Sequence, residues 1–292
     1  MLRRLLQSAF LLLALAALAG CGGARIAYNN ADTVVRWMAD DYFALEGVQD
    51  DEFKARLARF HAWHRNQELP RYSALAASAG EKLADGLTEQ KLEWAWDSVM
   101  ERYRHMARRA APELAAVLVT LTPAQFEQLE KKYAKSDAEY ARKHLKGGEA
   151  KQRERREERN LELMREWFGA LSDEQEARLK SASARLPQLA ALRLQNRQRR
   201  QREFVELLKT HRNPAELEPG LRQWLGNWEH GAAPDYLRLS LQYRREYMQM
   251  LLELDRSLAP EQRAHAVARL NDYSQLFAAL AGQGKLARSG AD

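Results

Sequence analysis

The chain contains few residues of the types that favour β-sheets, and this scarcity restricts its fold more than any other feature. Only 14 of its 292 residues are Val, Ile or Thr, the β-branched types that pack best on a pleated surface. Because 46% of the residues are hydrophobic, the chain can still bury a substantial core. The composition therefore predicts an all-α fold and argues against a β-sandwich, a β-barrel or a parallel α/β sheet.

Apolar residues recur at helical spacing along nearly the whole chain after Asn30. This pattern predicts an elongated multi-helix bundle of antiparallel amphipathic helices. We expect Pro70 to bend or end one helix, Pro112 to interrupt another, and Pro187 to kink a third. We place a helical domain at residues 31–282, with a candidate sub-boundary at 147–148 where Gly147 and Gly148 break a helix, and a flexible tail at 283–292.

The N-terminal segment has the three parts of a secretory signal peptide. Arg3 and Arg4 form a basic start, and an apolar run from Leu5 to Leu18 follows. Small residues then lead to Cys21, the single cysteine of the chain. We therefore predict a cleaved signal peptide over residues 1–20. The apolar run is shorter than the ~20 residues that a spanning helix needs, and one cysteine excludes an intramolecular disulfide and a cysteine-ligated zinc site.

The Leu18-Ala19-Gly20-Cys21 sequence resembles the lipobox of bacterial lipoproteins. The resemblance implies that the Cys21 thiol carries diacylglycerol and that Cys21 becomes the first residue of the mature chain. Residues 21–30 would then form a lipidated tether to the membrane. Gly22 stands where an Asp would mark inner-membrane retention, so the resemblance implies the outer membrane, on its periplasmic side.

A helix-start motif is repeated along the chain. Leu121-Thr122-Pro123-Ala124-Gln125 and Leu171-Ser172-Asp173-Glu174-Gln175 each predict a capping box, in which the hydroxyl and the Gln side chain bond each other's backbone N–H groups. A third copy, Leu258-Ala259-Pro260-Glu261-Gln262, lacks the hydroxyl. Leu87-Thr88-Glu89-Gln90 has its Gln one position early, and we do not count it.

These motifs resemble the Leu-Thr-x-x-Gln signature of the Spy/CpxP family of periplasmic helical proteins over residues 121–180. That resemblance implies a cradle-like helical hairpin that shields unfolding clients or senses envelope stress. The N-terminal half resembles an uncharacterised family of proteobacterial lipoproteins, a domain of unknown function, which implies no activity. The residues that carry this second resemblance are 27–32, Trp37, 41–43, 63–65 and 68–72.

The sequence offers little that points to catalysis. No Gly-x-Ser-x-Gly elbow and no phosphate-binding loop occur, so we predict a non-enzymatic protein without a cofactor. His61, His64 and Glu68 share one face of a predicted helix and form the distant alternative of a metal site, without an identified fourth ligand. Trp residues at helical spacing, such as Trp96, fit either a core or a client groove.

A basic run suggests a second kind of function. Five arginines fall within ten residues that contain no acid, and they could contact anionic lipid, lipopolysaccharide or peptidoglycan. Our first hypothesis remains a lipid-anchored interaction or chaperone-like module that binds an envelope protein or an unfolded polypeptide; nucleic acid is excluded by export. The alternative is an envelope-binding structural module that uses the basic run. The residues of that run are Arg193, Arg197, Arg199, Arg200 and Arg202.

Overall fold

The computed structural model describes the backbone of residues 20–289 and the side chains of residues 23–282. All regular elements in this range are helical, which confirms the all-α prediction. The expected signal peptide lies outside the described residues except for Gly20. In chain order the helices are α2 (Gly20–Asn29), α3 (Ala31–Phe43), α4 (Val48–Trp63), the π-turn η1 (His64–Glu68), α5 (Leu69–Ala84), α6 (Glu89–Leu118), α7 (Pro123–His144), α8 (Gly148–Phe168), α9 (Asp173–Arg185), α10 (Ala190–Thr210), α11 (Pro214–Gly226), α12 (Pro234–Asp255) and α13 (Pro260–Ser289).

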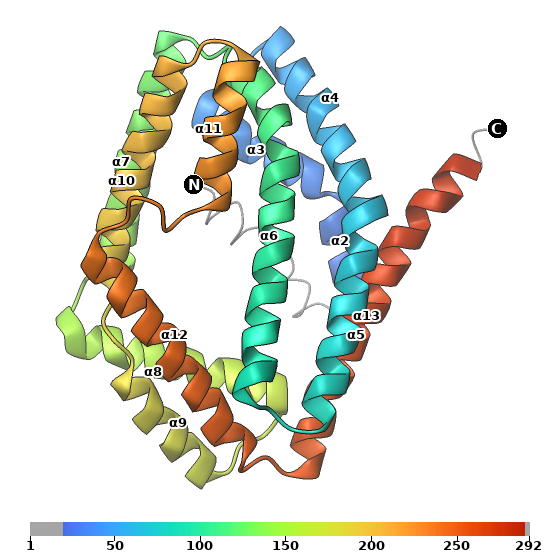
Figure 1. Cartoon of the computed structure of the whole chain (residues 1–292), viewed down its shortest axis with the longest axis vertical. Helices are drawn as coiled ribbons and strands as arrows, with labels where there is room; N and C mark the ends of the chain where they lie inside the picture. The colour runs from blue at the N-terminus through green and yellow to red at the C-terminus, as the bar shows by residue number, and fades with distance from the viewer. Residues whose placement is uncertain (1–19, 290–292) are drawn as a thin grey trace.

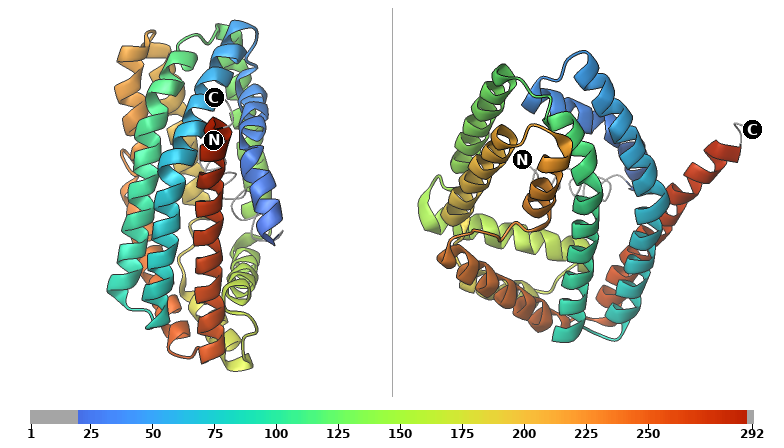
Figure 2. Two further views of the ribbon diagram at one scale, coloured as in Figure 1. Left: turned by 90° about the vertical axis from the view of Figure 1, so that its right-hand side faces the viewer. Right: turned by 45° about the horizontal axis from the view of Figure 1, so that its top comes forward.

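The helices lie along the sides of a frame (Figure 1). Elements α4, η1 and α5 form one long side, α7 and α10 form the other, and α6 runs between them. Helices α8, α9 and α12 close the lower end, and α13 packs beside α5. Figure 2 shows that α2, α3 and α8 lie on one face of the frame and α6 on the opposite face.

Three separate hydrophobic clusters hold the frame together. The upper core joins α3, α4, α6, α7, α10 and α11, and its Ala111, Leu129 and Leu217 have no exposed surface. The lower core joins the end of α5 to α8, α9, α12 and α13 around Met250 and Leu254. The terminal core joins α2, α5 and α13 through Ala24, Leu69, Leu276 and Leu280. Burial is thus concentrated at the two ends and one side of the frame.

The expected break at Pro112 is wrong, because α6 continues through this proline to Leu118. Ala111 and Ala115 on either side of it are fully buried in the upper core, where α6 packs against α11. This burial holds the helix together although proline removes one backbone hydrogen bond. The structure also differs from the expected kink at Pro187, in the opposite direction. Helix α9 ends at Arg185 and α10 begins at Ala190, so this proline lies between two separate helices.

Pro70 is accommodated by a π-turn that precedes it. The Leu69 N–H bonds the His64 carbonyl five residues before it, and Pro70 lies in the first turn of α5. A wider turn displaces the carbonyl groups that the proline ring would otherwise meet. Helix formation therefore continues almost without interruption from Val48 to Ala84.

The chain ends also differ from their predicted form. The segment expected to be a tether, residues 21–30, is helical through Asn29, and Ala24 is buried against the α13 side of the molecule. Helix α13 continues to Ser289, so much of the expected tail at 283–292 is helical. Between α7 and α8, Gly147 and Gly148 adopt φ values of +90° and +71°, which favour glycine and end the preceding helix.

Candidate functional site

The two ends of the described chain meet on the π-turn. The Tyr28 hydroxyl of α2 lies 2.9 Å from His64 Nδ1. Arg65 donates from Nη1 to the Leu280 carbonyl of α13 at 3.1 Å and from Nη2 to Asn29 Oδ1 of α2 at 2.8 Å. We call this cluster the terminal junction, formed by Tyr28, His64, Arg65 and Glu68 with the residues that contact them. Since π-turns often mark functional positions, it is the first candidate site.

A fully buried carboxylate closes the terminal junction toward α6. Glu68 has no exposed surface. Its Oε1 lies 2.6 Å from Arg71 Nη1 and 2.7 Å from His105 Nδ1, and its Oε2 lies 3.7 Å from Arg102 Nη1. Arg102 and His105 belong to α6, so Glu68 joins α6 to the π-turn. The arrangement compensates the buried charge and links two helices.

Tyr28 and His64 of the junction are neutral at ordinary pH. Burial, reinforced by the neighbouring His61, lowers the pKa of His64 to about 4. Burial raises the pKa of Tyr28 above its usual range. The Tyr28 hydroxyl therefore keeps its proton and forms a hydrogen bond with Nδ1 of the neutral His64.

This cluster predicts a loss of stability in acid. In the unfolded chain the pKa of His64 returns to near 6.5. The contribution of His64 to the free energy of unfolding is therefore fully present above pH 6.5 and is lost as the pH falls toward about 4. We expect the free energy of unfolding to drop by about 2 kcal/mol through this residue between pH 7 and pH 5. Urea unfolding at both values measures it, and His64→Gln serves as the comparison. An equal pH dependence in the variant would exclude His64 as the cause.

The metal alternative finds no support in this geometry. Glu68 is surrounded by Arg71, Arg102 and His105, and the His64 Nδ1 position is taken by Tyr28. Within the described part of the chain no group of three or more His, Cys, Asp or Glu residues is placed to hold a metal ion. His61, His64 and Glu68 therefore belong to a structural junction, and we do not propose a metal function for them.

The basic run on α10 does not form one free face, as the second hypothesis required. Arg197 Nε lies 2.5 Å from Asp137 of α7, and its Nη2 donates to Ser136 at 2.7 Å. Arg200 donates to the Trp224 carbonyl and lies over the Trp224 ring. The remaining members divide similarly: Arg193 lies over Tyr243, Arg199 pairs with Glu203, and Arg202 is exposed.

These contacts predict different effects for two arginines of the same run. Arg197→Ala leaves Asp137 buried without its guanidinium, and we expect a loss of about 2 kcal/mol in unfolding free energy. Arg202→Ala removes an exposed side chain, and the expected change is within about 0.5 kcal/mol. Paired chemical unfolding curves give both values. Equal effects would show that the run acts through its surface charge.

The two predicted capping boxes are both present. Thr122 accepts from the Gln125 N–H and Ser172 from the Gln175 N–H, while each Gln side chain accepts from the N–H of its cap residue, at 2.9 Å and 3.0 Å. The third copy begins α13, where Gln262 Oε1 accepts from the Ala259 N–H at 2.9 Å. The missing hydroxyl therefore does not prevent this half of the motif.

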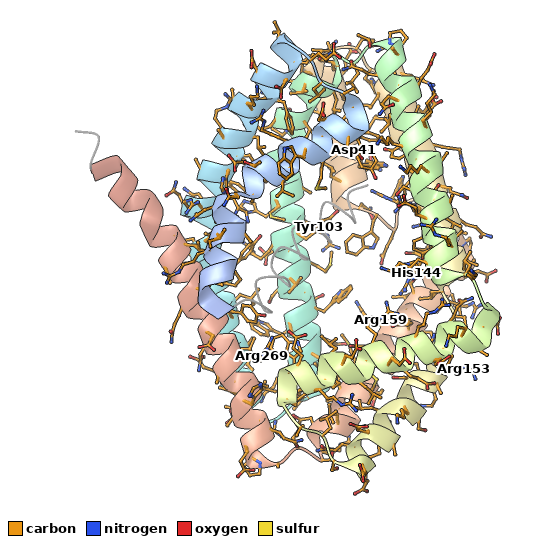
Figure 3. The ribbon with its side chains drawn as sticks, turned by 180° about the vertical axis from the view of Figure 1, so that it is seen from behind. Asp41, Tyr103, His144, Arg153, Arg159 and Arg269 are labelled. Atoms are coloured by element: carbon orange, nitrogen blue, oxygen red, sulfur yellow. The ribbon has the colours of Figure 1, made fainter. Side chains whose placement is uncertain are left out.

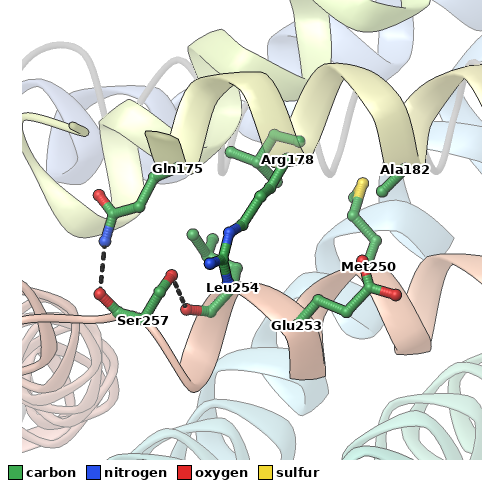
Figure 4. Close-up of a pocket in the computed structure, with 8 residues that line it drawn as sticks. Gln175, Arg178, Ala182, Met250, Glu253, Leu254 and Ser257 are labelled. Atoms are coloured by element: carbon green, nitrogen blue, oxygen red, sulfur yellow. Dashed lines mark hydrogen bonds between the residues drawn. The ribbon is translucent and has the colours of Figure 1, made fainter. Parts of the chain in front are cut away.

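The Gln side chains have a further role that the sequence did not indicate, because they meet in pairs. Gln175 donates to the Ser257 carbonyl at 2.7 Å, and Gln262 donates to the Ala170 carbonyl at 2.6 Å. The two amides also lie 2.9 Å from each other. This lower Gln pair holds the α8–α9 turn against the α12–α13 turn, and Figure 4 shows Gln175 bonded to Ser257 at one end of a pocket that Met250 and Leu254 also line.

The upper end of the frame repeats this arrangement. Gln125 donates to the Ala44 carbonyl at 2.9 Å, Gln49 donates to the Thr120 carbonyl at 2.7 Å, and the two amides bond each other. This upper Gln pair joins the α3–α4 turn to the α6–α7 turn. In all four copies a Leu precedes the Gln by four residues, at Leu45, Leu121, Leu171 and Leu258. That spacing is the sequence signal that could have revealed Gln49.

The largest exposed apolar side chains lie in two regions. Trp96 and Val99 of α6 are 38% and 49% exposed, and Leu241 of α12 is 47% exposed. Ile26 of α2 and Trp37 of α3 are 67% and 70% exposed. Val48, at the start of α4, is also exposed and belongs to neither region. We call the first group the α6–α12 patch and the second the α2–α3 face. Figure 3 views the face that carries α2 and α3.

A known family matches most of the chain. The model of the family of unknown function DUF6279 matches residues 41–237. The chain belongs to this family. No curated protein matches the chain. No solved structure matches it. The matched segment contains Gln49 and Gln125 of the upper Gln pair, and His64, Arg65 and Glu68 of the terminal junction. It does not contain Tyr28 of that junction or helix α13.

Proposed function

We propose that this DUF6279 chain is a non-enzymatic lipoprotein, anchored through Cys21 to the periplasmic side of the outer membrane, which acts as an interaction or chaperone-like helical module. The observation that carries the anchor is the N-terminal sequence: Arg3 and Arg4, an apolar run, and the lipobox-like ending at Cys21. Gly22 supports the outer membrane over the inner one. Within residues 20–289, no helix combines the length and apolar character of a membrane span.

The interaction part of the proposal rests on the α6–α12 patch. Helices α6 and α12 pack against each other, and they expose Trp96, Val99 and Leu241. The Arg244 guanidinium lies 5.3 Å above the Trp96 ring. An exposed aromatic and aliphatic surface beside an arginine is suited to apolar and acidic segments of an unfolded polypeptide. The resemblance of residues 121–180 to the Spy/CpxP family supports the same class of partner.

The anchor is tested by lipid incorporation. We expect radiolabelled palmitate to enter the full-length protein in a Gram-negative host and Cys21→Ser to abolish it, because a serine hydroxyl cannot form the thioether. Mass spectrometry of the N-terminal peptide identifies the lipid, and membrane fractionation gives its location. Retained palmitate in the Cys21→Ser variant would contradict the proposal.

The interaction role is tested with an unfolding client. We expect the mature chain to suppress light scattering by a heat-aggregating protein, and replacement of Trp96, Val99 and Leu241 by Ser to weaken this suppression. Val48→Ser is the matched control, because Val48 is 85% exposed but lies far along the chain from the patch. Inertness of the unmodified chain at molar excess would rule out the chaperone-like role.

A further inference from the structure

The α2–α3 face presents large apolar side chains to the outside, opposite a well-packed inner stripe. Ala24, Ala39 and Tyr42 are 3%, 8% and 8% exposed, on helices that contact α13, α4 and α7, whereas Ile26 and Trp37 are 67% and 70% exposed. Tryptophan left this open is costly in water, and its amphipathic ring is favoured at membrane interfaces. The inner packing therefore fixes α2 and α3 and leaves Ile26 and Trp37 exposed, with exposed Asn29 and Asn30 between them in the chain.

The exposed residues share one side of the molecule. Backbone hydrogen bonds of helical spacing continue through the α2–α3 junction, from Asn30 N to the Ile26 carbonyl and from Val34 N to the Asn30 carbonyl. Ile26 and Trp37 are eleven residues apart, which is close to three helical turns. Both helices lie on the same face of the frame (Figures 2 and 3). Ile26 and Trp37 are therefore exposed on two neighbouring helices of that face.

The short distance along the chain from Cys21 to the α2–α3 face indicates what covers this face. Ile26 lies five residues after Cys21, which corresponds to about 8 Å along a helix. Helix α2 starts at Gly20, is packed on α13 from Ala24 onward, and is held by the Tyr28 and Arg65 bonds of the terminal junction. A lipid on Cys21 would thus be joined to the body by a short, docked helix, which keeps this face near the bilayer.

Resting on the proposed lipid anchor, we propose that the α2–α3 face lies on the phospholipid leaflet that holds Cys21, with Ile26 and Trp37 inserted at the level of the head groups. Arg25, next to Ile26 in the chain, is exposed and supplies a positive charge near the anionic phosphates of the leaflet. Asp40 and Asp41 are exposed one turn beyond Trp37, and Asp41 pairs with Lys132. The contact with the leaflet therefore ends before these acidic groups. The apolar residues thereby add a second membrane contact to the lipid chains.

The test uses the lipidated full-length protein. Because Cys21 is the single cysteine and its thiol is occupied in the lipidated chain, an introduced cysteine can be labelled alone. Ile26→Cys, Trp37→Cys and the control Val99→Cys are each labelled with a polarity-sensitive fluorophore and reconstituted into vesicles of phosphatidylethanolamine and phosphatidylglycerol. Val99 is the matched control, since it is 49% exposed on α6, on the opposite side of the frame.

We expect aqueous iodide quenching at positions 26 and 37 to fall by about threefold or more on reconstitution, with quenching by spin-labelled lipid, and position 99 to remain open to iodide. Equal iodide access at all three positions would overturn the inference. Shielding of 26 and 37 that appears without vesicles and rises with protein concentration would overturn it in favour of self-association. The mass of the N-terminal peptide is measured in parallel, so a missing lipid would count against the anchor and not against this face.

Discussion

Replacement of Glu68 by Ala is expected to lower the free energy of unfolding by about 3 kcal/mol. The carboxylate is fully buried and is contacted by Arg71, Arg102 and His105 from two elements. Its removal leaves the Arg102 side chain, only 19% exposed, without its buried counter-charge and opens a cavity between the π-turn and α6. Urea unfolding followed by far-UV circular dichroism measures the change.

A nearby carboxylate provides the control for this prediction. Glu101 also contacts Arg102, but its side chain is 68% exposed, so Glu101→Ala is expected to change stability by no more than about 0.5 kcal/mol. Glu68→Gln keeps the shape and part of the hydrogen bonding, so its loss is expected to lie between the two. If Glu68→Ala cost no more than Glu101→Ala, the terminal junction would not stabilise the fold.

Replacement of Gln175 by Ala is expected to cost about 3 kcal/mol, because its buried side-chain amide makes four hydrogen bonds to three residues. It accepts from the Ser172 N–H, donates to the Ser257 carbonyl, and exchanges bonds with Gln262. The substitution leaves the Ser172 N–H and the Ser257 carbonyl without these partners inside the lower end of the frame. Gln125→Ala is expected to act alike at the upper end, since its contacts with Thr122, Ala44 and Gln49 are equivalent.

A double-mutant cycle separates the pairing from the capping. We expect Gln175→Ala and Gln262→Ala together to cost at least about 0.5 kcal/mol less than the sum of the single changes, because either one alone breaks the amide pair. Gln90→Ala is the matched control. Gln90 follows Leu87 and Thr88 at a helix start, but it is exposed, and the expected change is within about 0.5 kcal/mol. Additive losses would show that each Gln acts only on its own helix.

Local signals in the sequence were sufficient for the all-α class and for two of the helix starts. The scarcity of Val, Ile and Thr selects the all-α class, and the spacing of Thr122 with Gln125 and of Ser172 with Gln175 places two helix starts that the structure contains. These signals succeed because propensity, periodicity and capping act between residues a few positions apart. Proline was less reliable, since buried Ala111 and Ala115 keep α6 continuous across Pro112.

The sites depended on contacts between distant residues. Gln49 meets Gln125 across 76 positions and Gln175 meets Gln262 across 87, and no local pattern specifies such partners. The same holds for Glu68, whose helical spacing with His61 and His64 suggested a metal site, while the fold brings it to His105 and Arg102 instead. The basic run on α10 has the composition of a surface, yet Arg197 bonds to α7 and Arg200 bonds to α11.

The sequence by itself determined the helical class, the helix starts at Thr122 and Ser172, and the lipobox-like Cys21 on which the proposed anchor rests, because each depends on neighbours along the chain. Only the tertiary structure decided which polar side chains are buried, which arginines are free, and which apolar residues remain outside. Packing at the two ends of the frame buries one side of each amphipathic helix and exposes the other. The same packing that covers Ala24 and Tyr42 leaves Ile26 and Trp37 in contact with solvent.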